Sequence, residues 1–222
     1  MSLEKIHLRK LLKIFYLPAR ERVAVLREDI RNEIQKERGE DTDGGDFYSP
    51  FWADAKNHVA GKVDLQAQVK SRIGSNKRRE RLYPQLADGF LSWWNEKRRW
   101  RNEPFEFLPE NVKVQFPIPK LRGVVKIENL LALKVGDQSN RIIYPYFSEK
   151  PKLPDEGGRI GLWLLGEALP NYRREDLRIL DILRGTSFAA IDYPLQGNER
   201  DLFLSKYEGA LKEWKKLRKE RI

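Results

Sequence analysis

Apolar residues recur every three or four positions near the start of the chain, first within residues 3–17 and then from Pro18 to about Arg38. This spacing is typical of amphipathic helices. Pro18 suits the first turn of the second helix, and Gly39 suits its end. The pattern predicts an N-terminal helical hairpin. Its apolar face must dock on the rest of the chain or on a second copy.

The next segment alternates breaks with helical patterns. Residues 39–46 are rich in Gly and Asp and predict a solvated linker. Asp41, Asp43 and Asp46 resemble part of a calcium loop, but the glutamate that closes such a loop is missing. Two helices are then expected, one from Ser49 to about residue 73 and one over 84–101, separated at 74–76.

The period changes from helical to alternating after residue 104, which predicts strands. Pro145 suggests an edge strand or a bulge. Residues 160–169 are apolar nearly all round, which predicts a buried helix on the sheet, and 199–219 predict an amphipathic C-terminal helix. The expected strands are 112–118, 125–135, 141–147, 177–183 and 187–193, with a hairpin turn at 136–140.

These elements predict an α+β fold in which a mostly antiparallel sheet of about five strands is flanked by helices. The expected division places the N-terminal helical arm and acidic linker in residues 1–45. The α+β domain then occupies residues 46–222.

Composition removes several classes of chemistry. The chain has no cysteine and only His7 and His58, which excludes disulfides, thiol catalysis and a zinc site of the usual His/Cys type. No apolar run is long enough to span a bilayer, and the charged N-terminal residues do not form a signal peptide. We therefore expect a cytoplasmic protein without a membrane partner.

The charge is strongly positive and unevenly distributed. Formal net charge is +10 over 222 residues, which favours contact with a polyanion, although solubility alone is the competing explanation. Between residues 70 and 101, ten cations face only Glu80, Asp88 and Glu96. The cations of this basic stretch are Lys70, Arg72, Lys77, Arg78, Arg79, Arg81, Lys97, Arg98, Arg99 and Arg101.

Within the basic stretch, residues 76–81 join two helices and are expected to follow a phosphate backbone. Trp94 shares a helix flank with Arg98 and Arg101, where its indole could stack on an unpaired base; the alternative is that the tryptophans belong to the core. A second cationic cluster at 212–221 is interpreted as a solvated helix face.

The order of elements from residue 84 onward resembles the PD-(D/E)XK nuclease fold of RecB-type and CRISPR-associated exonucleases. In that family an acid on the second core strand and a Glu-x-Lys on the third hold Mg²⁺. Glu128 lies roughly where the first acid would be, and Glu96 could match the helix acid of some members. The third strand, 142–147, has no Glu-x-Lys, so the resemblance implies a degenerate scaffold without a metal cofactor.

Other candidate groups have simpler explanations. Asp181 and Asp192 lie in apolar strand contexts and are expected to pair with a nearby arginine, Arg178 or Arg184.

Three functions remain open at this stage. The favoured one is non-catalytic nucleic-acid binding, with the resemblance implying an accessory role in bacterial or phage DNA transactions or defence. The second is a protein-interaction or oligomerisation subunit, with residues 3–38 docking a partner or forming a homodimer. The third is a Mg²⁺-dependent nuclease.

Overall fold

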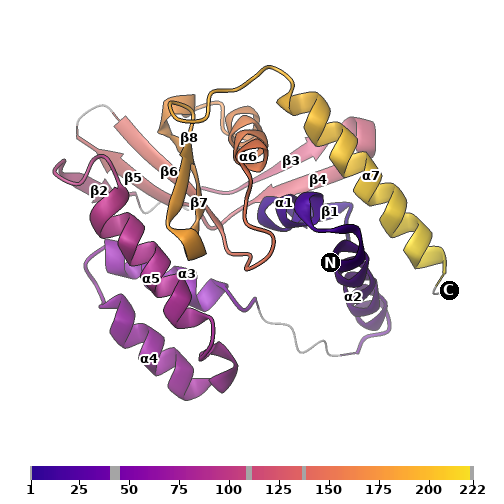
Figure 1. Ribbon diagram of the computed structural model, residues 1–222, viewed down its shortest axis with the longest axis horizontal. Helices are drawn as coiled ribbons and strands as arrows, with labels where there is room; N and C mark the ends of the chain where they lie inside the picture. The colour runs from indigo at the N-terminus through magenta and orange to yellow at the C-terminus, as the bar shows by residue number, and fades with distance from the viewer. Residues whose placement is uncertain (1, 41–45, 109–111, 137–138, 221–222) are drawn as a thin grey trace.

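The computed structural model describes residues 2–40, 46–108, 112–136 and 139–220 (Figure 1). The α+β class is confirmed, as is the N-terminal helical hairpin. The helices are α1 (Leu8–Tyr16), α2 (Ala19–Glu37), α3 (Ser49–Val59), α4 (Leu65–Ser75), α5 (Tyr83–Ser92), α6 (Asp155–Ala168) and α7 (Glu199–Lys219). The strands are β1 (Lys5–His7), β2 (Phe105–Phe107), β3 (Val114–Ile118), β4 (Gly123–Ile127), β5 (Leu131–Val135), β6 (Ser139–Tyr146), β7 (Leu177–Asp181) and β8 (Thr186–Ala189).

The main sheet has five strands in the order β2-β5-β6-β7-β8. All neighbours are antiparallel except β6 and β7, which run parallel with Tyr144 opposite Ile179. This arrangement confirms a mostly antiparallel sheet of five strands, but β2 was not predicted, and the strand expected over 112–118 is β3 of a second sheet. A smaller sheet, β1-β4-β3, was not predicted. It uses residues 5–7, which the sequence pattern had assigned to the first helix.

The predicted strand over 125–135 is wrong, because the chain changes sheets in its middle. β4 belongs to the small sheet and β5 to the large one. Between them Asn129 has a φ of 62°, a left-handed conformation that asparagine tolerates better than most residues. Ile127, Leu131 and Leu133 share one parity on both sides of the break, and the polar Asn129 between them is the one sign of it in the pattern.

Two other predictions need correction. The helix expected over 49–73 is interrupted after Val59, where Gly61 adopts a φ of 70° and Asp64 caps α4 by accepting from the backbone N–H of Ala67. Pro145 lies on the central strand β6 and not on an edge. It is tolerated there because β5 pairs with β6 only as far as Ile143, leaving the proline a neighbour on β7 alone.

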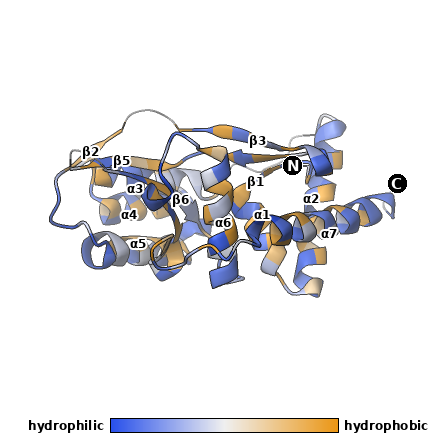
Figure 2. Cartoon of the chain, turned by 90° about the horizontal axis from the view of Figure 1, so that it is seen from above, coloured by the Kyte–Doolittle hydropathy of each residue, from blue (hydrophilic) through white to orange (hydrophobic). Residues whose placement is uncertain are grey.

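Helices cover both faces of the main sheet and create two cores. Alternate residues of β6 divide between them: Ile142 and Tyr144 face α1, α6 and α7, whereas Ile143 faces α3 and α5. In Figure 2 the strands carry long hydrophobic stretches, and α7 alternates between hydrophobic and hydrophilic segments. α6 packs on β7 and β8, as its all-round apolar sequence predicts.

The N-terminal arm docks on its own chain. α1 and α2 pack against α7 (Figure 1), and the hydroxyl of Tyr207 donates to the carbonyl of Leu3 at 2.7 Å. Ion pairs join Arg22 to Glu213 and Arg218 to Glu33. The apolar stripe of the arm is therefore covered without a second copy, and a partner for residues 3–38 stays a prediction.

Candidate anion-binding site

Two glycines bring α5 against the turn between β7 and β8. A Cβ built on Gly89 would lie 2.1 Å from the carbonyl oxygen of Ile182, and a Cβ on Gly185 would lie 2.6 Å from the carbonyl oxygen of Gly89. Gly185 also has a φ of 54°, which glycine adopts without strain. This backbone contact fixes the end of α5 beside the β7–β8 turn, so the segment after α5 faces residues 185–192.

That segment begins with a single π-helical turn, Trp93–Lys97, after which the chain turns away. Trp94 and Trp100 pack edge to face at 5.6 Å between ring centroids and are nearly fully buried. The guanidinium of Arg98 lies over the Trp94 ring at 3.6 Å. The aromatic packing anchors residues 93–100, and the neighbouring cations Lys97 and Arg99 remain exposed to solvent.

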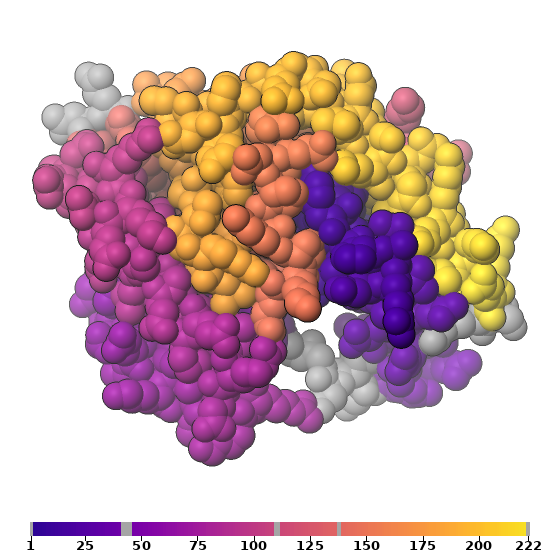
Figure 3. Space-filling view, in the orientation of Figure 1, coloured from indigo at the N-terminus to yellow at the C-terminus, as the bar shows by residue number. Residues whose placement is uncertain are grey.

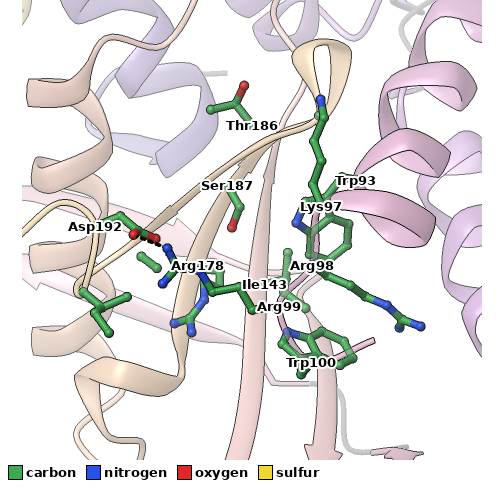
Figure 4. A pocket seen from close by; sticks show the side chains of 13 residues that line it. Trp93, Lys97, Arg98, Arg99, Trp100, Ile143, Arg178, Thr186, Ser187 and Asp192 are labelled. Atoms are coloured by element: carbon green, nitrogen blue, oxygen red, sulfur yellow. Dashed lines mark hydrogen bonds and ion pairs between the residues drawn. The ribbon is translucent and has the colours of Figure 1, made fainter. Parts of the chain in front are cut away.

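A pocket of about 310 Å³ lies between this segment and the β7–β8 turn (Figure 4). Its charged lining consists of Lys97, Arg98, Arg99 and Arg178 against a single carboxylate, Asp192. Hydroxyl groups of Thr186 and Ser187 also line it. On the face shown in Figure 3, the pink surface of the segment that follows α5 meets the orange surface of β8 and the residues after it.

Hydrogen bonds fix the rim of the pocket. Arg99 donates to Asp192 at 2.6 Å, although its side chain is 68% exposed. Lys97 reaches across to the carbonyl of Arg184 at 3.4 Å, and Figure 4 shows its side chain extended toward the β7–β8 turn. The cations that line the cavity therefore come from two separate parts of the chain, and the guanidinium of Arg98 is turned toward the Trp94 ring.

The guanidinium groups of Arg178 and Arg98 are partly buried. Burial and, next, the nearby charge of Arg141 lower the pKa of Arg178 to about 10, and its Nη1 donates to the carbonyls of Glu175 and Leu177. Burial and the charge of Arg101 also lower the pKa of Arg98. The Nε and Nη1 atoms of Arg98 are buried and have no hydrogen-bond partner among the described residues. Both groups remain protonated at neutral pH, in a setting that an added anion would stabilise.

The predicted phosphate-binding loop is only partly free. Lys77 and Arg78 are exposed and make no ion pair with any described residue. Arg79 lies over the ring of Tyr83 at 5.4 Å, and Arg81 forms a two-pronged pair with Glu149 at 2.5 and 2.6 Å.

Of the remaining predicted cations, one is held in an ion pair and two are exposed. Arg72 is held by the buried Asp54 at 2.8 and 3.0 Å, so its role is structural. Lys70 and Arg101 are exposed and form no ion pair with a described residue. Arg101 donates only to the carbonyl of Asn95, at 3.4 Å.

Trp94 is a core residue in this structure. Its side chain is 6% exposed, and Arg98 covers one face of the ring. This position agrees with the alternative that the tryptophans belong to the core. A base could reach the indole only if Arg98 moved.

The two candidate carboxylates are not placed for metal binding. Glu96 is exposed and accepts from Ser92 at 3.4 Å, whereas Glu128 lies in the turn after β4, 4.0 Å from His7. Across the described part of the chain, no three His, Cys, Asp or Glu residues form a group that could hold a metal ion. The likeness of Asp41, Asp43 and Asp46 to a calcium loop cannot be compared with the structure, because residues 41–45 lie outside the described residues.

Sequence reasoning missed half of the pocket. Arg178 was considered only as a partner for a strand acid. Asp181 does pair with Arg184, at 3.3 Å, but Asp192 pairs with Arg99 and not with Arg178 or Arg184. Arg178, Thr186 and Ser187 reach the site only through the pairing of β7 with β8, which no local pattern shows.

Comparison with known proteins supplies no family. No protein-family model matches the chain, and no curated protein matches it significantly. Among the described residues no helix is long and apolar enough to cross a membrane.

Proposed function

We propose that this chain binds nucleic acid through the cationic pocket beside α5, and that it does so without catalysing cleavage. The observation that carries the proposal is that Lys97, Arg98, Arg99 and Arg178 line one cavity with a single carboxylate. Like charges repel, so such a group gains stability when an anion enters. Phosphate suits such a group, because its oxygens match the guanidinium fork.

Exposed cations around the pocket extend the proposed surface. Lys97 lines the pocket and Arg101 follows the lining residue Trp100 in the chain, and both are accessible to solvent. Neutralising phosphates with such cations releases counterions, which makes affinity fall with salt. The resemblance to PD-(D/E)XK nucleases supports an accessory role in DNA transactions or defence, and a non-catalytic role fits the scattered carboxylates of the described residues.

Charge reversal of the rim tests this proposal. The double variant K97E/R101E should weaken binding to a mixed-sequence single-stranded oligonucleotide by tenfold or more at low salt. It should also lower the slope of log Kd against log salt by roughly 0.7 for each lost phosphate contact. The measurement is fluorescence anisotropy over a salt series.

A matched control reverses the same number of charges elsewhere. Lys36 on α2 and Lys216 on α7 are both exposed and do not line the pocket. K36E/K216E should therefore change affinity less than threefold. Equal losses in the two double variants would show that only net charge matters, and the proposed surface would be rejected. Mg²⁺-dependent cleavage that disappears in E128A would contradict the non-catalytic reading.

A further inference from the structure

The pocket beside α5 is a cavity and not a flat basic face, and this shape restricts its ligand. Its walls are the segment after α5 on one side and residues 185–192 on the other. An internal phosphodiester is flanked by a sugar on both sides and runs along a surface. A terminal phosphate protrudes from its strand and can enter a cavity. We propose that the pocket binds a phosphomonoester, the phosphorylated end of a nucleic-acid strand; this rests on the proposed function.

The charge of the pocket matches this ligand. Four cations against Asp192 leave a surplus of three positive charges. A phosphodiester carries one negative charge, whereas a phosphomonoester carries about −1.5 to −2 at neutral pH. The terminal group therefore neutralises more of the surplus than an internal one. It also offers three terminal oxygens, each able to accept more than one hydrogen bond.

The donors of the pocket are suited to these oxygens. Arg99 and Arg178 present guanidinium groups near Asp192 on one side of the cavity, as Figure 4 shows. The half-buried hydroxyl of Ser187 adds a neutral donor, whereas that of Thr186 donates to the carbonyl of Arg184 at 3.5 Å. Guanidinium and hydroxyl groups together bind a dianionic phosphate by charge-assisted hydrogen bonds.

The pocket lacks the features that would read a base. The exposed fractions of Trp93 and Trp100 are 3% and 5%, so neither offers a free ring face for stacking. The one large exposed apolar side chain among the described residues is Ile191, at 74%. It lines the mouth of the pocket, where it can contact the sugar of the terminal nucleotide. The pocket should therefore detect a strand end irrespective of sequence.

The experiment compares oligonucleotides that differ only at their ends. Fluorescein-labelled single strands of one sequence carry a 5′-phosphate, a 3′-phosphate or hydroxyl groups at the free end. We expect a phosphorylated end to bind about tenfold more tightly than the hydroxyl end. R178Q should reduce this preference to less than twofold and weaken the hydroxyl-ended strand less than the phosphorylated one. R99Q, which removes a cation of the exposed rim and so lowers the positive surplus, should also reduce the preference and provides a second test if R178Q does not fold.

The outcomes separate this inference from the proposed function. If every strand binds with the same affinity, the end-binding inference is overturned and general nucleic-acid binding stands. If no strand binds at 50 mM salt, roughly the lower end of the usual range for such measurements, both fail. A mononucleotide that competes for the pocket as strongly as the phosphorylated strand would assign the phosphomonoester site to a small molecule, which overturns the strand-end inference.

Discussion

The two ends of α5 carry similar basic sequences and have different surroundings. Before α5, Arg79 lies over Tyr83 and Arg81 is paired with Glu149. After α5, residues 97–99 meet Arg178 from β7, and Asp192 is the single carboxylate of the cavity they form. The difference shows that the number of cations in a stretch does not define an anion site. The carboxylates and cations that the fold adds from elsewhere decide it.

The largest expected effect on stability comes from the close contact of Gly89 with the β7–β8 turn, which holds the end of α5 beside the cavity. In G89A the new methyl group would meet the backbone carbonyl of Ile182, which cannot move aside without shifting the β7–β8 turn. We expect a loss of about 3 kcal/mol or more in the free energy of unfolding. The measurement is urea unfolding followed by circular dichroism.

A glycine in open space supplies the control for that measurement. Gly209 lies in α7 with no atom within 4 Å of an added Cβ. G209A should raise stability by up to about 1 kcal/mol, because alanine favours the helix. If G89A unfolded at the same urea concentration as the wild type, the close contact between α5 and the β7–β8 turn would not be needed to form the pocket.

Within the basic stretch, Arg72 and Arg81 each pair with one carboxylate, but we expect them to contribute differently to the free energy of unfolding. In R72M, Asp54 keeps a charge in a side chain that is only 6% exposed, without its partner. Breaking a buried pair costs roughly 3–5 kcal/mol, and the 37% exposure of Arg72 reduces the expected loss to about 2 kcal/mol. Thermal unfolding of R72M and R81M side by side checks the difference, and similar losses would contradict it.

Charge reversals at the two ends of α5 test which end contributes more to nucleic-acid affinity. K77E/R78E removes two exposed cations before the helix, and K97E/R101E removes two after it. Both change net charge equally. We expect the second variant to lose about tenfold in affinity and the first about threefold, because only the second removes charge at the cavity. A larger loss in K77E/R78E would place the main contact at the other end.

The smallest expected effect concerns Arg81 and Glu149. Their side chains are 69% and 38% exposed, so solvent screens the pair and it contributes little to stability. The hydrogen bond from Arg81 lowers the pKa of Glu149 below its usual 4.5. A lowered carboxyl pKa stabilises the native state above pH 4.5, and this contribution is lost as the pH falls through the native pKa.

The stability difference between wild type and R81M should therefore be present at pH 7 and vanish in acid. Denaturant unfolding between pH 7 and pH 3 measures it. A difference that grows on acidification would mean that Arg81 stabilises the fold through another contact.

The amino-acid sequence by itself determined much of the fold. Helical spacing predicted the N-terminal arm, the buried helix α6 and the amphipathic helix α7, because each must bury one apolar face to form. Alternation predicted the strands, but the change of sheets at 128–130 was missed, although Asn129 interrupts the apolar positions there. Local patterns report which residues are buried and not which sheet buries them.

Only the tertiary structure decided the candidate site. The basic stretch was visible in the sequence, yet Arg178, Thr186 and Asp192 joined it through strand pairing and the contact between Gly89 and Gly185. The same folding brought Asp54 to Arg72 and Glu149 to Arg81, which neutralised cations that the sequence left free. Electrostatic interactions depend on distance in space and on burial, and these are fixed only when distant segments pack together.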